Sequence, residues 1–283
     1  MGAETTLVKK IVMIAILLLA VFASVALGRQ GFFGNGRPRM SNGPSGGRCL
    51  VPGAGDFREA AREVDQSGFV YARLRYHPVD WWRQRTPEVP WHHDYPDGDT
   101  MFPTSLERLT EVHTSKDAYQ IVDIDSKDLF KYPFIYLPEP GLLDLSPGDV
   151  KNLKEYLERG GFIMIDDFRG NPSDNSEMEN LVVQLKKMYP DRSLEPVPAS
   201  HPIFNIFFEV DPTSMLPPYT MSNSGDVQFL GMSDDRGRLQ IMVDFNNDTS
   251  EYWQALDIGS CSIKEAGTAV ELGVNYALYA MSH

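Results

Sequence analysis

The sequence predicts an α/β domain built on a mostly parallel sheet, with a β-hairpin at one edge. Three observations support this class. Strand-like and helix-like segments alternate from Phe69 onward, the segment FIMI is continuously apolar, and two late strand-like segments are joined by a short polar turn. Alternation of this kind implies right-handed crossovers between parallel strands. A continuously apolar strand is typical of one that is covered on both faces.

Residues 69–138 contain three predicted strands and one predicted helix. The segment FVYARLRY, residues 69–76, is rich in aromatic and branched side chains, which favour a strand. A helix is predicted over 104–113, because its apolar residues fall on one face. Short apolar segments then predict a strand over 119–125 and another that ends at Pro138.

The segment LSPGDVKNLKEYLERGG predicts the best-defined helix of the chain. Ser146 and Asp149 together form a capping box, and Pro147 occupies the first helical position. Gly160 suits the left-handed residue that ends many helices. The strand FIMID follows directly over 162–166.

The remainder of the chain predicts a helix, a hairpin and a final helix. The helix over 176–190 is followed by a short strand-like segment over 193–198. Residues 227–245 predict two strands joined by a polar turn near Gly237, which is typical of a hairpin at a sheet edge. The final helix, over 266–281, carries small residues along one narrow side, so we expect it to pack closely.

The N-terminus has the layout of a secretory signal peptide. Lys9 and Lys10 precede an apolar run over 11–27, and Ala26 and Gly28 suit signal peptidase. The run is slightly shorter than the roughly 20 apolar residues of a spanning helix, which favours a cleaved signal peptide. An uncleaved membrane anchor is the alternative. The predicted organisation is a signal peptide or membrane anchor over 1–28, a Gly/Pro/Ser-rich disordered tether over 29–66 and the α/β domain over 67–283.

Composition narrows the classes of partner. The formal net charge is −13 at pH 7, and no run of Lys and Arg with interleaved aromatic residues appears. Such a surface repels phosphate backbones, so we expect no nucleic-acid partner. Nothing in the sequence indicates that Cys49 and Cys261 pair, and a domain of this size can form its core without disulfides.

Two adjacent aspartates end the predicted strand 162–166. Ligands bind beyond the carboxyl ends of strands in open parallel sheets, and successive strand residues point to opposite faces. At most one of Asp166 and Asp167 would therefore serve a given ligand, and we favour Asp167. His201 follows the last predicted crossover and could act with Asp167 in acid–base or metal-ligand chemistry. The alternative is that these side chains only bind backbone groups.

A second group of candidates lies over 77–99, a segment dense in Trp, His and Asp. Because consecutive residues rarely converge on one ion, the run of His92, His93 and Asp94 predicts no metal. The tryptophans of this segment could form a platform for a sugar or peptide, or could cover the core. They are Trp81, Trp82 and Trp91.

Arg73 and Arg75 share one face of the first strand and require carboxylate partners. Asp94, Asp99 or Asp167 could supply them. The segment DFNNDTSEYW after the hairpin could line the rim of the crevice or form a polar surface loop. The candidate ligand-binding residues are Arg73, Asp94, Tyr95, Asp166, Asp248 and Trp253, the catalytic candidates are Asp167 and His201, and no metal or cofactor is predicted.

The sequence lacks the common motifs of nucleophilic and phosphate-binding enzymes. No Cys follows either buried strand, and neither a Gly-x-Ser-x-Gly elbow nor a Gly-rich phosphate loop is present. These absences disfavour a hydrolase that uses a Ser or Cys nucleophile.

From Phe69 to His283 the chain resembles a bacterial family, the domain of unknown function 4159. The resemblance rests on FVYARLRY, HHDYP, YPFIYLPEPG, LSPGDVKNLKEYLERGGFIMIDDFRG, HPIFNIFF, GRLQIMVDFNNDTSEYW and LGVNYALYAMSH, in this order. It implies a fold similar to class I glutamine-amidotransferase-like domains, a flavodoxin-like three-layer sandwich, without their Cys–His apparatus. It also implies an exported or membrane-attached protein, and some members accompany von Willebrand-type and MoxR-type proteins. The family often has Trp-Glu where this chain has Trp253-Gln254.

Together these observations predict an exported bacterial module, periplasmic or extracellular, that contacts the membrane only through its N-terminal segment. The expected role is non-catalytic binding or interaction in the cell envelope, with an envelope protein or glycan as partner. The alternative is a hydrolase of a carbohydrate or envelope substrate that uses Asp167 and His201, with Arg73 holding an anion.

Overall fold

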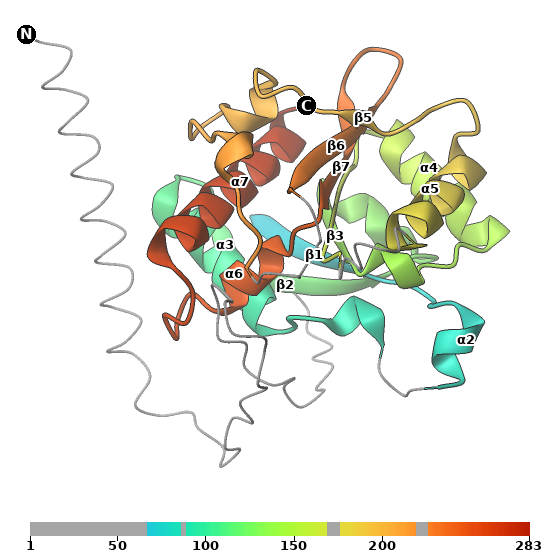
Figure 1. Ribbon diagram of the computed structural model, residues 1–283, viewed down its shortest axis with the longest axis horizontal. Coiled ribbons are helices and arrows are strands. Elements are labelled where there is room, and N and C mark those ends of the chain that lie inside the picture. Colours follow the sequence, from blue (N-terminus) through green and yellow to red (C-terminus); the bar gives the residue numbers. More distant parts are fainter. Residues whose placement is uncertain (1–66, 86–88, 169–175, 219–225) are drawn as a thin grey trace, which may run out of the picture.

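A seven-stranded sheet in the order β2-β1-β3-β4-β7-β6-β5 forms the centre of the protein. The computed structural model describes residues 67–85, 89–168, 176–218 and 226–283 (Figure 1). The strands are β1 (Phe69–Arg75), β2 (Thr114–Asp123), β3 (Phe134–Pro138), β4 (Phe162–Asp166), β5 (Glu195–Pro196), β6 (Gln228–Ser233) and β7 (Leu239–Phe245). The first four and β7 pair in parallel, whereas β6 and β5 add antiparallel at one edge. The predicted mostly parallel sheet with an added hairpin is confirmed.

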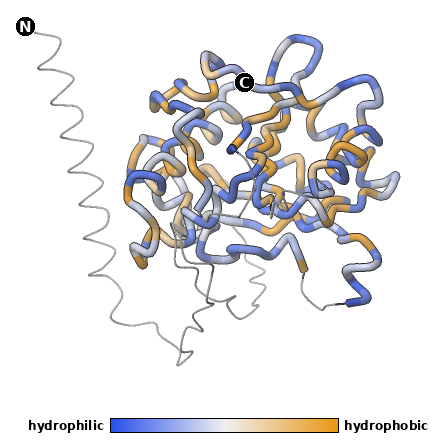
Figure 2. Tube along the Cα trace, viewed as in Figure 1, coloured by the Kyte–Doolittle hydropathy of each residue, from blue (hydrophilic) through white to orange (hydrophobic). Residues whose placement is uncertain are grey.

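Helices cover both faces of the sheet and give three layers (Figure 1). The α-helices are α2 (Asp80–Arg83), α3 (Asp97–Leu109), α4 (Pro147–Glu158), α5 (Ser176–Met188), α6 (Thr249–Gln254) and α7 (Ile263–Ser282). The 3₁₀ helices are η1 (Pro90–His92), η2 (Lys127–Lys131), η3 (Pro140–Leu142), η4 (Pro202–Phe204) and η5 (Pro212–Ser214). Helices α3, α6 and α7 contribute to one buried apolar cluster, and α4 and α5 contribute to another on the opposite face. The strands between them are among the most hydrophobic segments (Figure 2).

Local sequence explains where several elements begin. Ser146 Oγ accepts a hydrogen bond from the Asp149 amide at 3.2 Å, and the Asp149 carboxylate accepts one from the Ser146 amide at 2.9 Å. This is the predicted capping box. In contrast, α3 begins seven residues before the predicted start at 104, although Pro103 lies inside it. The packing of this helix against the core outweighs the loss of one backbone donor at the proline.

Gly273 allows α7 to pack closely against its neighbours. A Cβ at this position would lie 2.6 Å from ring atoms of both Phe102 and Trp253. Only glycine therefore fits between these two rings. At Gly273 the helix packs as closely as its small residues predict.

The direction of winding reverses between β1 and β3. The chain passes from β1 through α3 to β2 on one side, and from β3 through α4 to β4 on the other. The order β2-β1-β3-β4-β7 corresponds to the flavodoxin-like arrangement, in which ligands bind beyond the carboxyl ends of the strands at the reversal. The strand order thus predicts a ligand site at the carboxyl edge of the sheet.

Within the described ranges we find no helix with the length and hydrophobicity of a membrane span. The predicted signal or anchor and tether, residues 1–66, lie outside them. Cys261 is disulfide-bonded, which the sequence pattern does not indicate.

Candidate functional site

Four non-glycine residues with left-handed backbone lie beyond the carboxyl ends of the parallel strands. They are Asp94, Glu139, Asp167 and Asn246, with φ between 48° and 61°. All four are buried. This conformation costs about 1–2 kcal/mol for a residue with a Cβ, and strained residues concentrate at functional sites. These left-handed residues therefore lie at the carboxyl edge of the sheet, where the strand order also predicts a ligand site.

The two aspartates at the end of β4 serve different partners. Asp166 Oδ2 accepts hydrogen bonds from the Thr249 amide at 2.7 Å and the Ser250 amide at 3.1 Å. Asp167 instead places Oδ2 2.8 Å from His93 Nδ1. Asp166 thus anchors the first turn of α6, whereas Asp167 faces a charged group.

Four side chains converge here and are called the edge cluster: His93, Asp94, Asp167 and Asp248. One potential ligand atom of each lies within 4.8 Å of those of the others. His93 and Asp94 follow η1, and Asp248 is the N-cap of α6, where it accepts a hydrogen bond from the Glu251 amide. The three carboxylates are buried, and the His93 side chain is 31% exposed. This donor set could hold a metal ion.

Hydrogen bonds fix the orientation of Asp94. Tyr136 donates from its hydroxyl to Ser250 Oγ at 2.6 Å, and Ser250 Oγ in turn donates to Asp94 Oδ2. Gln254 Nε2 donates to Asp94 Oδ1 at 2.8 Å and also to Glu251 Oε2. Strand β3 and helix α6 therefore position a side chain that comes from the β1–α3 connection.

Burial and mutual repulsion alter the acidity of this region. Burial, with repulsion from Asp94 and Asp248, raises the pKa of Glu251 to about 9. Burial also raises the pKa of Asp244 to about 7, against the hydrogen bonds from Tyr276 and Thr249.

The carboxylates beside His93 shift its pKa in the opposite direction to burial. Burial alone would lower its pKa, but the carboxylates of Asp167 and Asp94 raise it to about 12. An imidazole with this pKa stays protonated at neutral pH and is a poor general base. The His93–Asp167 pair by itself is therefore not tuned for proton transfer.

Arg73 holds the segment that carries His93. Its guanidinium pairs with Asp99 at 2.6 Å, and both side chains are fully buried. Its Nη1 also donates to the backbone carbonyls of Trp91 at 3.1 Å and His93 at 2.7 Å. Of the predicted partners the structure selects Asp99, and Arg73 is an anchor inside the protein. Arg75 pairs with Asp123, a partner outside the predicted set.

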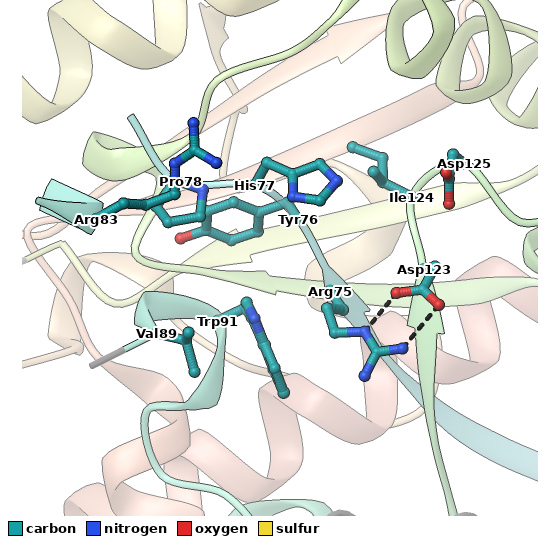
Figure 3. A pocket seen from close by; sticks show the side chains of 10 residues that line it. All are labelled: Arg75, Tyr76, His77, Pro78, Arg83, Val89, Trp91, Asp123, Ile124 and Asp125. Carbon is teal, nitrogen blue, oxygen red and sulfur yellow. Dashed lines mark hydrogen bonds and ion pairs between the residues drawn. The ribbon is translucent and has the colours of Figure 1, made fainter. Parts of the chain in front are cut away.

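A cavity of about 400 Å³ is lined in part by Val89 and Trp91 of the same segment (Figure 3). It lies at the carboxyl ends of β1 and β2 and is lined by Arg75, Tyr76, His77, Pro78, Arg83, Val89, Trp91, Asp123, Ile124 and Asp125. Basic, acidic and aromatic side chains thus face a common space. Trp91 forms part of its wall, and His93, two residues later, belongs to the edge cluster.

Two further predicted ligand-binding residues, Trp253 and Tyr95, are buried in the protein. Trp253 is fully buried and stacks on Phe102 with ring centroids 4.5 Å apart, so it is part of the core. Tyr95 is also buried, with its ring 5.2 Å from that of His92.

His201 is not brought together with Asp167. Its Nδ1 accepts a hydrogen bond from the Ile203 amide, so it caps η4, and its ring lies 5.7 Å from that of Tyr279. The Tyr279 hydroxyl accepts a hydrogen bond from the Leu239 amide at the start of β7. That is the amino end of the parallel strands, whereas Asp167 follows their carboxyl end.

The convergence of His93 with Asp94 differs from the sequence prediction, in which these two residues do not face one ion. Neighbouring residues rarely face one ion, but left-handed backbone at Asp94 alters the usual divergence of consecutive side chains. Asp in such a position is several-fold enriched, yet nothing in the local sequence distinguishes this aspartate from others. Ser250 and Gln254 were also missed, because their role depends on contacts across more than 150 positions.

Fold and site together define a three-layer α/β protein with a buried acidic cluster and an adjacent cavity at the carboxyl edge of its sheet. The family described as Domain of unknown function (DUF4159) matches residues 71–281. The match covers more than half of the chain, and the chain belongs to this family. No curated protein shows significant similarity to it.

Proposed function

We propose that this protein is an exported, non-catalytic binding module of the cell envelope, which takes a small polar ligand at the carboxyl edge of its sheet. The observation that carries the proposal is the cavity at the carboxyl ends of β1 and β2, two parallel strands of the sheet. Ligands of open parallel sheets bind beyond the carboxyl ends of the strands, and ligand sites are typically concave with a few convergent polar groups.

The lining of the cavity indicates the class of ligand. Arg75 lies over the Trp91 ring, with the guanidinium carbon 5.8 Å from the ring centroid, and pairs with Asp123. Arg83 and Asp125 add both signs of charge to the lining, and His77 adds an imidazole ring. A glycan fragment or a short peptide of the envelope offers the matching combination of polar groups and stacking surface.

Two features favour binding over catalysis. The chain has no Ser or Cys nucleophile motif after its buried strands. The His93 imidazole of the edge cluster is kept protonated by the carboxylates of Asp167 and Asp94, which raise its pKa. Binding needs neither a nucleophile nor a general base.

A ligand screen with a matched pair of arginine variants tests this role. Arg83 and Arg159 are both exposed and each pairs with an acid on its own helix, but Arg83 lines the cavity and Arg159 caps α4. In calorimetric titrations with envelope glycan fragments and peptides, Arg83→Ala should weaken binding about tenfold, the cost of one lost charged hydrogen bond. Arg159→Ala should bind as the wild type does.

The screen has two results that would overturn the proposal. Equal affinities of both variants would show that the ligand does not bind in the cavity. Release of a hydrolysis product would show that the protein is an enzyme and not a non-catalytic binding module.

Export rests on the N-terminal sequence. Lys9 and Lys10 precede the apolar run, and Gly28 ends the small-residue pattern that signal peptidase accepts. We expect mass spectrometry of protein from the periplasmic or extracellular fraction to show a mature chain that begins at Arg29. A chain found only in the cytoplasm would contradict export. An intact N-terminus in the membrane fraction would indicate the anchored form instead.

A further inference from the structure

We propose that the edge cluster binds one divalent transition-metal cation through His93, Asp94, Asp167 and Asp248. The site lies beside the cavity but shares none of its lining residues. The inference therefore goes beyond the proposed ligand binding, and either can fail without the other.

The spacing of the four side chains fits one ion. Their potential ligand atoms lie within 4.8 Å of one another. With bond lengths of about 2.0–2.6 Å to nitrogen or oxygen, ligands on opposite sides of a cation are about 4–5 Å apart. Small side-chain movements would thus bring all four atoms into coordination. His93, the one partly exposed member, provides the route by which an ion enters.

Charge also favours a cation at this position. Three buried carboxylates face a single imidazole. The guanidinium of Arg73, although buried, is already paired with Asp99. A divalent cation would replace the proton on His93 and compensate the carboxylates together, as buried charge requires.

Glu251 supplies an independent observation. It is 1% exposed, and its Oε1 has no hydrogen-bond partner among the described residues. Its other oxygen shares Gln254 Nε2 with Asp94, so the Glu251 carboxyl group stands beside the cluster. A buried oxygen left without a partner is costly, and either the cation or a water bound to it would complete this one.

The surrounding hydrogen bonds resemble those that orient metal ligands. Asp94 receives hydrogen bonds from Ser250 and Gln254. Asp248 Oδ1 accepts one from the Glu251 amide at 3.0 Å and lies 3.1 Å from Ser250 Oγ. Such outer contacts hold ligating carboxylates in one orientation. They leave the cluster organised before an ion arrives.

The donor set selects the class of cation. Mg²⁺ and Ca²⁺ prefer oxygen ligands throughout, whereas imidazole suits Zn²⁺ and related first-row ions. One nitrogen with three carboxylates therefore favours a transition ion. The usual order of affinities places Zn²⁺ above Mn²⁺, so we expect Zn²⁺ to bind most tightly of the ions Zn²⁺, Mn²⁺, Mg²⁺ and Ca²⁺.

A matched pair of Asp→Asn variants tests the site in the full chain. Asp248 and Asp149 are both buried, and each accepts one backbone N–H at the start of a helix, but only Asp248 belongs to the edge cluster. Chelator-treated protein is titrated calorimetrically with ZnCl₂. The wild type and Asp149→Asn should bind one Zn²⁺ per chain. Asp248→Asn should lose at least about 100-fold in affinity, and Ser250→Ala about tenfold.

Melting curves separate a metal site from a purely structural cluster. In the presence of chelator, Asp248→Asn should melt no lower than the wild type, because Asn retains the helix cap and removes a repelled charge. With Zn²⁺, the wild type should melt higher and Asp248→Asn should not respond. A structural cluster predicts instead that Asp248→Asn is less stable in both solutions. If Asp248→Asn fails to fold, His93→Ala at the partly exposed position serves the same comparison.

Three results would overturn the inference. They are a wild type that takes up no Zn²⁺ at one per chain, cluster variants that bind as the wild type does, and Ca²⁺ or Mg²⁺ binding more tightly than Zn²⁺. None of these results decides whether the cavity binds a ligand, which is tested separately with the Arg83 and Arg159 pair.

Discussion

Replacing Arg73 with methionine is expected to lower the free energy of unfolding by about 3–5 kcal/mol, the cost of breaking a buried ion pair by removing one partner. The change leaves Asp99 buried without its counter-charge. It also removes the donor of the Trp91 and His93 carbonyls. Urea unfolding, followed by tryptophan fluorescence, measures the loss.

Arg75 provides the matched control on the same strand. It too pairs with an aspartate, Asp123, but the two side chains are 35% and 45% exposed. Exposed pairs contribute about 0–1 kcal/mol, so Arg75→Met should fall in that range. Equal losses for both variants would contradict the assignment of Arg73 as a buried anchor. Adding Asp99→Leu to Arg73→Met should recover part of the loss, since it removes the stranded charge.

Replacing Trp253 with alanine should also lower the free energy of unfolding by about 3–5 kcal/mol, the usual cost of deleting a buried tryptophan. The ring stacks on Phe102 at 4.5 Å, and its Nε1 donates to the Ala269 carbonyl at 3.1 Å. The substitution would leave a cavity between α3, α6 and α7. Thermal or urea unfolding checks the result.

Trp81 is the control for this second change. Its side chain lies on α2 and is 49% exposed. Surface substitutions usually stay within about ±0.5 kcal/mol, which is the range expected for Trp81→Ala. A small effect of Trp253→Ala would mean that Trp253 is accessible after all. It would then return to the ligand-binding candidates.

The sequence predicted those features of the fold that depend on local pattern. The capping box at Ser146 and the apolar strand 162–166 are both local, and both appear where expected. Helix α3 begins earlier than the sequence predicts, because Pro103 disfavours a helix locally whereas tertiary packing stabilises it. The short strand β5 covers only two residues of the predicted segment.

Less of the candidate site than of the fold could be predicted from the sequence. Asp167 lies at the strand end that topology marks for ligands, and sequence periodicity separated its role from that of Asp166. The pairing with His93 could not be foreseen, because it depends on the left-handed backbone of Asp94 and on the grip of Arg73 on a distant segment. His201 seemed equally suitable in sequence, yet the direction of β7 places it at the far end of the sheet.

The hold of Arg73 on two backbone carbonyls has an energetic consequence. Trp91 borders the cavity and His93 belongs to the edge cluster, and a single guanidinium fastens both. A cavity occupant that displaces Trp91 must also disturb His93. Thermodynamic reciprocity then requires each occupant to alter the affinity of the other by the same factor. Two neighbouring compartments of one protein would in this way report on each other's occupancy.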